Sequence, residues 1–248
     1  MKHPPHTTKV FITIIPILLL AACETPGGDN PDPGPGGETI GASKPSEAQP
    51  MWFPYYSNSF SHYDTGTDEP EGLLLLDGDF SVAKIGDNKV LTLPPEPLDD
   101  FGVLFGPRIP GNLRAQAKFL SSKSGRRVPA FALGIGGVDG FRAKLNLAHR
   151  QFQLVREGEV LAEVPFTWES DQWATIMVQR EKVKDEPETW AVKAKAWQGE
   201  EPAEWGIELE SDAKQSAGKC SVWAAPYSTR PIHIDDLTVF SANPLGAP

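Results

Sequence analysis

The feature that most constrains the fold is a two-residue alternation of apolar and polar side chains. It is clearest over residues 113–119, 141–147 and 190–196, where apolar residues stand at every second position. Successive side chains of a β-strand point to opposite faces of a sheet, so the pattern predicts strands with one buried and one wet face. In the first segment, Leu113 and Phe119 should point inward while Arg114 and Lys118 face water.

Many more segments of this kind follow one another, separated by turn signals such as Asp139-Gly140 and Glu157-Gly158. Further strands are predicted over residues 72–76, 80–85, 89–93, 101–105, 128–135, 152–156, 160–164, 173–179, 207–210, 220–224 and 232–240. Only short stretches such as Ser211–Gln215 tolerate a helix. We therefore predict an all-β fold, an antiparallel sandwich of two sheets, over residues 51–248.

The first 22 residues have the anatomy of a signal peptide. Lys2 and Lys9 supply positive charge, and the apolar run that ends at Ala22 is too short to span a bilayer as a helix. The run ends in Leu20-Ala21-Ala22-Cys23, which resembles the lipobox of bacterial lipoproteins.

That resemblance implies that residues 1–22 are removed and that Cys23 is acylated, so that the lipid bilayer becomes a partner of the chain. Glu24 stands where Asp would mark inner-membrane retention, which favours the outer membrane. An ordinary cleaved signal peptide with a chance cysteine is the alternative.

Residues 23–50 are predicted to be a lipidated cysteine followed by a flexible linker. After Cys23 this stretch contains six Pro and six Gly, and Ile40 is its only large apolar residue. Such a composition cannot bury enough surface to offset the entropy of ordering the chain.

Charge and cysteine content argue against a nucleic-acid partner and against a reactive cysteine. The formal net charge is −10, and it becomes −12 once the two lysines of residues 1–22 are removed, which argues against a nucleic-acid partner. Because Cys23 would be acylated, Cys220 is left without an intramolecular disulfide partner. Its place in a predicted strand indicates a buried, inert thiol.

Several motifs resemble those of concanavalin A-like jelly rolls of the laminin-G-like type. They are Pro70-Glu71-Gly72, the strands at 77–82 and 89–91, and the closing segments 218–224 and 231–239. The resemblance spans residues 54–241 and implies a jelly-roll sandwich. Phe80 stands where those domains more often have tryptophan, and Ile234 replaces their phenylalanine. The motifs of the related 3-keto-disaccharide hydrolases are absent from residues 126–144, so their activity is not carried over.

Glycosidases of this fold place two or three carboxylates on one face of a strand. Glu208 and Glu210 have that spacing and are weak catalytic candidates. Ile207 and Leu209 claim the apolar face of the same strand, however, so the alternative is that both glutamates are merely solvated.

Asp77 and Asp79 near the start of the domain, with Asp235 and Asp236 near its end, could hold a structural Ca²⁺ if the first and last strands are neighbours. The favoured alternative is that Asp235 or Asp236 accepts backbone hydrogen bonds at a turn.

Aromatic residues are candidates for stacking on sugar rings. Trp197, Trp205 and Tyr227 lie in or near predicted loops and are the ligand-binding candidates. The aromatic run at residues 52–56 is another platform, but packing of a first strand into the core is the favoured interpretation.

Three functions stay open. The leading one is an anchored lipoprotein that presents a non-catalytic glycan- or ligand-binding sandwich. The second is a diverged glycoside hydrolase of the same superfold acting on extracellular polysaccharide. The third is an envelope protein that binds another protein.

Overall fold

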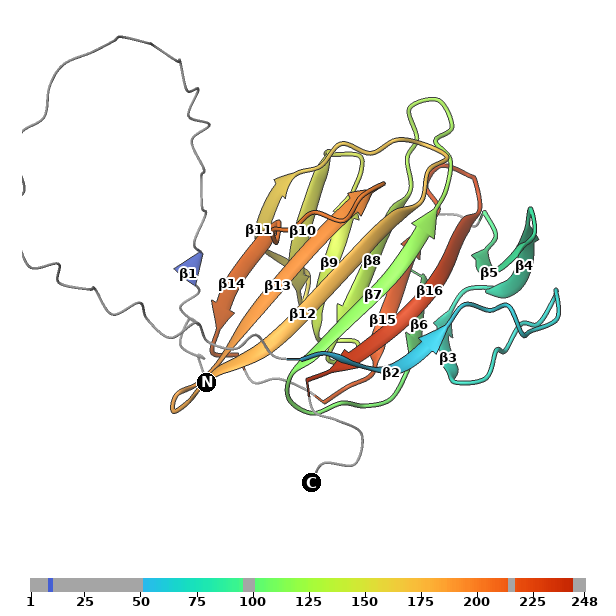
Figure 1. The fold of residues 1–248 in the computed structure, drawn as a ribbon. Helices are drawn as coiled ribbons and strands as arrows, with labels where there is room; N and C mark the ends of the chain where they lie inside the picture. The colour runs from blue at the N-terminus through green and yellow to red at the C-terminus, as the bar shows by residue number, and fades with distance from the viewer. Residues whose placement is uncertain (1–8, 11–50, 96–100, 214–216, 243–248) are drawn as a thin grey trace, which may run out of the picture. The chain divides into compact units, whose positions relative to one another are not determined.

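The computed structural model describes residues 9–10, 51–95, 101–213 and 217–242. Cys23 and the linker lie outside the described residues, as does the predicted signal peptide apart from Lys9–Val10. Within the described residues every paired strand is antiparallel, no helix occurs, and two sheets stack as a sandwich (Figure 1). The prediction of an all-β, two-sheet antiparallel sandwich is confirmed.

The two sheets differ in size and in order. The nine-stranded sheet runs β1-β14-β13-β12-β7-β16-β5-β4, with β2 also paired to β16. Its strands are β1 (Lys9–Val10), β2 (Phe53–Asn58), β4 (Ser81–Ile85), β5 (Asn88–Leu93), β7 (Leu113–Leu120), β12 (Ala174–Asp185), β13 (Glu188–Gln198), β14 (Ile207–Ser211) and β16 (Ile232–Ser241). The seven-stranded sheet runs β11-β10-β9-β8-β15-β6-β3. Its strands are β3 (Leu73–Asp77), β6 (Phe101–Phe105), β8 (Ala130–Ile135), β9 (Phe141–Asn146), β10 (Gln151–Arg156), β11 (Glu159–Pro165) and β15 (Cys220–Ala225).

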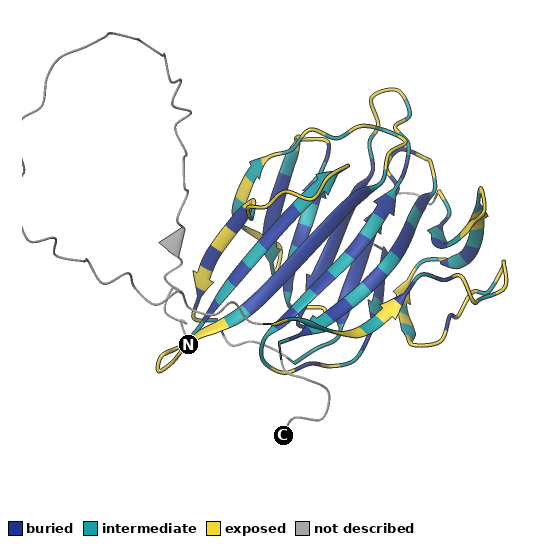
Figure 2. Cartoon of the chain, in the orientation of Figure 1, coloured by how far each residue is buried: buried dark blue, intermediate teal, exposed yellow. Residues whose placement is uncertain are grey.

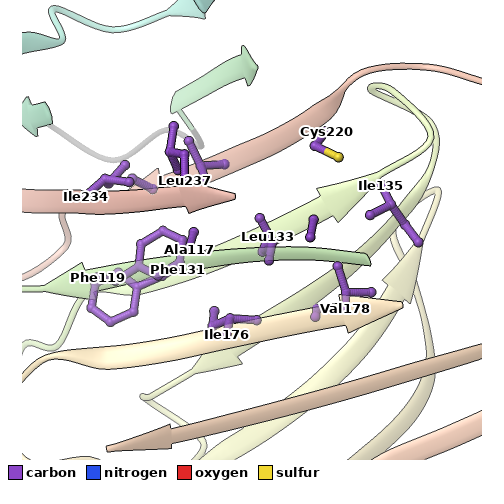
Figure 3. Close-up of a cluster of buried hydrophobic side chains, with 14 of the residues drawn as sticks. Ala117, Phe119, Phe131, Leu133, Ile135, Ile176, Val178, Cys220, Ile234 and Leu237 are labelled. Carbon is purple, nitrogen blue, oxygen red and sulfur yellow. The ribbon is translucent and has the colours of Figure 1, made fainter. Parts of the chain in front are cut away.

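The core lies between the sheets and follows the alternation in the sequence. Figure 2 shows buried and partly exposed residues in turn along the strands. Leu113 and Phe119 of β7 are almost completely buried, and Arg114 and Lys118 between them are not. Phe119 stacks across the sandwich on Phe131 of β8, with ring centroids 5.3 Å apart (Figure 3). Each large apolar side chain buried in this way contributes about 1.5–3 kcal/mol.

Most strand ends match the predictions, and the departures have local causes. The strand predicted from residue 128 begins at Ala130, after Pro129, which has no N–H to donate to a ladder. β12 and β13 extend beyond the predicted 173–179 and 190–196 into a hairpin whose far end is exposed. That part of the hairpin buries no apolar face, so the alternation that revealed the other strands is missing there.

Cys220 is buried in the core, as the sequence predicted. Burial raises the pKa of its thiol to about 12, although Arg180 and Lys219 lower it somewhat. A thiol with such a pKa stays protonated and unreactive at neutral pH. Among the described residues, none forms a helix of the length and hydropathy needed to cross a membrane.

Candidate functional site

The outer face of the seven-stranded sheet holds a pocket of about 320 Å³. Its floor comes from four adjacent strands: Ala130 and Ala132 of β8, Arg142 and Lys144 of β9, Gln153 of β10 and Trp223 of β15. The exposed residues Val138, Asp139, Glu157 and Val160 line its rim. Glu157 and Gly158 form the tight turn between β10 and β11, and both have positive φ.

Strand register explains why these side chains meet. One row of cross-strand neighbours is Gly102, Trp223, Ala132, Lys144 and Gln153. Neighbouring residues in such a row lie about 4.5–5.5 Å apart and face the same side of the sheet. The small Ala132 therefore sits between a large indole and two long polar side chains, which leaves a hollow.

Arg142 reaches across that hollow and stacks on Trp223. Its guanidinium carbon lies 3.5 Å from the centroid of the indole ring, and its Nη2 donates to the Val138 carbonyl at 2.9 Å. The indole Nε1 of Trp223 donates to Ser221 Oγ at 2.9 Å. A stacked cation and ring of this kind contribute about 0.5–2 kcal/mol, more as water is excluded.

Two glycines make the stack possible. A Cβ on Gly102 would lie 2.7 Å from the ring of Trp223, and a Cβ on Gly134 would lie 2.3 Å from Ser221 Oγ. Any larger residue at these positions displaces the indole or its hydrogen-bond partner.

A network of amides continues the polar side of the pocket. The buried Gln153 donates to Gln151 Oε1 at 3.2 Å and to Glu163 Oε2 at 3.0 Å. Its own Oε1 accepts from Asn146 Nδ2 at 3.3 Å, and Gln151 donates to Glu163 Oε1 at 2.8 Å. These bonds fix the amide of Gln153 in one orientation and use both of its N–H groups, so it offers a ligand the second lone pair of its Oε1.

The pocket combines cationic donors, fixed amides and an indole with apolar walls. Arg142 and Lys144 lie on the floor, while the carboxylates of Asp139 and Glu157 are exposed at the rim. Such a surface can bind oxygen-rich rings through hydrogen bonds and contact their C–H faces. These floor residues were missed as a site, although Arg142 and Lys144 stand at polar positions of a predicted strand.

The aromatic candidates lie elsewhere. Trp197 and Trp205 flank Lys195 on the outer face of the nine-stranded sheet, with their ring centroids 5.6 and 5.0 Å from its Nζ. Tyr227 lies in the turn between β15 and β16 and is 41% exposed. In the aromatic run, Trp52 lies against Arg114, and Tyr56 packs against the core from β2, which pairs with β16.

Glu208 and Glu210 occupy the solvent face of β14, whereas Ile207 and Leu209 are buried, as predicted. Glu208 forms an ion pair with Lys193 at 3.0 Å. The two glutamates thus lie on the nine-stranded sheet, not in the pocket of the seven-stranded sheet.

The four aspartates of the calcium hypothesis are divided between the two sheets. Asp77 ends β3 of the seven-stranded sheet and Asp79 follows it, while Asp235 and Asp236 belong to β16 of the nine-stranded sheet. Across the described ranges, no three His, Cys, Asp or Glu side chains gather into a group that could hold a metal ion. Asp235 accepts a hydrogen bond from the backbone N–H of Asp236 at 2.8 Å, as the favoured alternative has it, but at a bulge within β16 and not at a turn.

Comparison with known proteins shows similarity in fold alone. No protein-family model matches the chain, and no curated protein does. Among solved structures, the carbohydrate-binding module CBM66 from Bacillus subtilis is 15% identical, with 71% of this chain and 97% of that chain covered and a TM-score of 0.44.

Two further solved structures are similar at the same level. The Emp46p carbohydrate recognition domain in its potassium-bound form is 13% identical over 76% of this chain and 98% of that chain, with a TM-score of 0.47. The PL-14 alginate lyase from Aplysia kurodai is 9% identical over 75% and 98%, with a TM-score of 0.49. None of these likenesses bears on ligand or activity.

Proposed function

We propose that the protein is a lipid-anchored bacterial envelope protein whose β-sandwich binds a glycan without turning it over. The observation that carries the proposal is the Arg142–Trp223 stack in the floor of the pocket of the seven-stranded sheet, with Lys144 and Gln153 beside it.

A sugar ring matches the chemistry of this pocket. Its hydroxyls need donors and acceptors in fixed positions. Lys144 and Arg142 are the donors, and Gln153 Oε1 is an acceptor. Its C–H faces pack on apolar surface, which Val138 and Val160 offer at the rim. Pockets for small ligands begin at about 300 Å³, so the hollow has room for about one sugar residue of a chain that continues across the rim.

The absence of turnover is part of the proposal. Glycoside hydrolysis requires one carboxyl group that protonates the leaving oxygen and another that attacks or activates water. The pocket has two carboxylates, Asp139 and Glu157, and both are exposed on loops at the rim. Neither belongs to the strands that form the floor, so the floor itself offers no pair of carboxylates for this chemistry.

The anchor rests on the sequence Leu20-Ala21-Ala22-Cys23, which supports acylation of Cys23 and localisation at the outer membrane. Mass spectrometry of the mature N-terminus tests it directly. We expect a diacylated Cys23 and loss of membrane association in Cys23→Ser. An unmodified cysteine would overturn the anchor and leave the binding proposal intact.

A glycan array followed by calorimetry on the purified protein tests binding. We expect Arg142→Gln and Lys144→Gln each to weaken the affinity for the selected glycan about tenfold, which is ~1.4 kcal/mol. Arg126→Gln is the matched control, because that cation is exposed at a hairpin tip outside the pocket. If Arg142→Gln and Lys144→Gln bind the glycan as tightly as Arg126→Gln does, the pocket is not the binding site. Steady release of reducing sugar would show that the protein is a hydrolase.

A further inference from the structure

A second hollow, of about 450 Å³, lies on the outer face of the nine-stranded sheet. We call it the aspartate groove, and its argued lining is Asn88, Lys118, Trp173, Thr175, Asp235 and Asp236. These residues come from β5, β7, β12, β16 and the segment just before β12. None of them belongs to the pocket on the other sheet.

A distortion of β16 creates the groove. The pairing of β16 with β7 is regular up to Asp235 and Lys118, then shifts register before Thr238. Asp236 within this bulge has a φ of 49°, in the left-handed region that non-glycine residues seldom adopt. Consecutive side chains of a regular strand point to opposite faces, yet both Asp235 and Asp236 line the groove.

The two carboxylates are held in place differently. Asp235 is buried and accepts hydrogen bonds from Asn88 Nδ2 at 2.7 Å and from the Asp236 N–H at 2.8 Å. Asp236 is partly exposed and forms an ion pair with Lys118 Nζ at 2.7 Å. Burial raises the pKa of Asp235 above its ordinary value, against the lowering effect of its hydrogen bonds.

We propose that the aspartate groove is a second ligand site and that it takes an uncharged, hydroxyl-rich ligand, a neutral sugar residue. Carboxylates and an amide bind adjacent hydroxyl groups through fixed acceptors and donors, and the indole of Trp173 offers a ring face for stacking. Two carboxylates against one lysine leave the groove acidic, so an anionic sugar is repelled.

The same groups fit a metal ion poorly. Ca²⁺ takes six to eight oxygen ligands, and one of the two carboxylates here is already neutralised by Lys118. The neutral-sugar site also stands independently of the pocket on the seven-stranded sheet, because the two sites have no residue in common.

Tryptophan indole resonances separate the two sites in one experiment. The chain has seven tryptophans, so ¹⁵N-indole labelling of the full protein in detergent gives a simple spectrum, in which Trp173→Phe and Trp223→Phe assign the two reporters. Cellotetraose, mannotetraose and xylotetraose serve as neutral probes and a galacturonate oligomer as the anionic probe. We expect at least one neutral probe to shift the Trp173 signal and the anionic probe to leave it in place.

Two variants and a control complete the test. Asp235→Asn and Asp236→Asn should each weaken the neutral probe at least tenfold at the Trp173 signal, and Asp236→Asn guards against a folding defect because its side chain is partly exposed. Asp87→Asn, an exposed acid next to Asn88, should leave the affinity unchanged. The proposal is overturned if no neutral probe shifts Trp173, if the Asp235 and Asp236 variants bind normally, or if CaCl2 alone shifts Trp173. If instead the proposed function is wrong and the pocket of the seven-stranded sheet binds no glycan, Arg142→Gln will leave glycan affinity unchanged.

Discussion

The two outer faces of the sandwich arise from the same alternation of side chains but differ in the size of their central residues. On the seven-stranded sheet the centre is built from small residues, and Arg142 lies across them onto Trp223. On the nine-stranded sheet the centre carries the long side chains of Arg114, Met177 and Lys195. The segment between β13 and β14 folds back on that face, because the Pro202 carbonyl accepts from Lys195 Nζ at 2.8 Å.

The difference shows how side-chain size in a sheet decides where a ligand fits. Met177 and Lys195 point outward and are nevertheless buried, since the protein covers that face with its own chain. Arg114 lies 4.5 Å from the ring of Trp52 and 5.8 Å from that of Trp205. The small central residues of the seven-stranded sheet leave a hollow that another molecule can fill. The long side chains of the nine-stranded sheet are covered by the protein itself, and open space remains on that face where the bulge interrupts β16.

The largest effect should come from filling the floor of the first face. In Gly102→Ala the new methyl group would lie within 2.7 Å of the Trp223 ring, which Arg142 confines from another side. We expect a loss of about 1–3 kcal/mol in the free energy of unfolding, as for overpacked sites, together with lost glycan binding. Denaturant unfolding followed by tryptophan fluorescence measures the change.

Gly206→Ala, just before β14, is its control. A Cβ there would meet nothing closer than 3.6 Å, and Gly206 has no positive φ. Its stability should be unchanged or slightly raised, because alanine restricts the unfolded chain. Equal losses in the two variants would mean that the small residues of the first face have no special role.

A smaller effect should follow from releasing the cover of the second face. Lys195 is buried, forms an ion pair with Glu201 at 2.6 Å and lies between two tryptophan rings. Because Glu201 is half exposed, the pair itself contributes little, and we expect Lys195→Ala to cost about 1 kcal/mol, mostly through lost packing.

Hydrogen exchange measures the local consequence, with faster exchange expected across residues 199–206. Lys193→Ala on the same strand is the matched control, since its partner Glu208 lies on β14 and not in that segment. If exchange in residues 199–206 stays slow in Lys195→Ala, the cover is held by other contacts and the contrast between the faces weakens.

The fold could be predicted because its cause is local. Alternation in segments such as residues 113–119 and 141–147 marks each strand and its buried face without knowledge of the partners. β1, at Lys9–Val10, could not be foreseen in this way, because it pairs with β14 inside a segment that predicts a signal peptide.

The candidate sites could not be predicted because they depend on register and on space. Trp223 and Arg142 are far apart in the sequence, and only the order β9-β8-β15 brings one over the other across Gly134. Asp235 and Asp236 were recognised as a pair of oxygen ligands, yet the bulge that turns both into one groove has no sequence signal that we can name.

A still smaller effect concerns pH. His233 on the nine-stranded sheet is partly buried beside Thr92, with 2.9 Å between Nδ1 and Oγ1, and burial lowers its pKa below the ordinary value. The unfolded chain then binds a proton more readily than the folded one, so stability is lost as pH falls below about 6.5. Asp235 acts in the opposite sense, because its raised pKa favours the folded state as pH falls.

Urea unfolding from about pH 7.5 down to about pH 5, carried out on the wild type and on His233→Gln, isolates the histidine, because Asp235 is present in both proteins and its contribution cancels in the difference. The wild-type protein should lose stability over this range, and His233→Gln should lose less. If the free energy of unfolding changes with pH by the same amount in both proteins, the pKa of His233 does not differ between the folded and unfolded chains.

The smallest effect should come from the exposed edge of the nine-stranded sheet. Glu208 is paired with Lys193, with the two side chains 47% and 25% exposed, and such surface pairs contribute about 0–1 kcal/mol. Glu208→Gln should therefore change stability by less than ~0.5 kcal/mol and leave glycan binding unchanged, and Glu210→Gln should do the same. A polysaccharide turnover assay on the wild type and both variants also tests whether either glutamate is catalytic. Loss of a measurable activity in either variant would show that the protein is a hydrolase with a catalytic carboxylate on β14, and the proposal of binding without turnover would then be wrong.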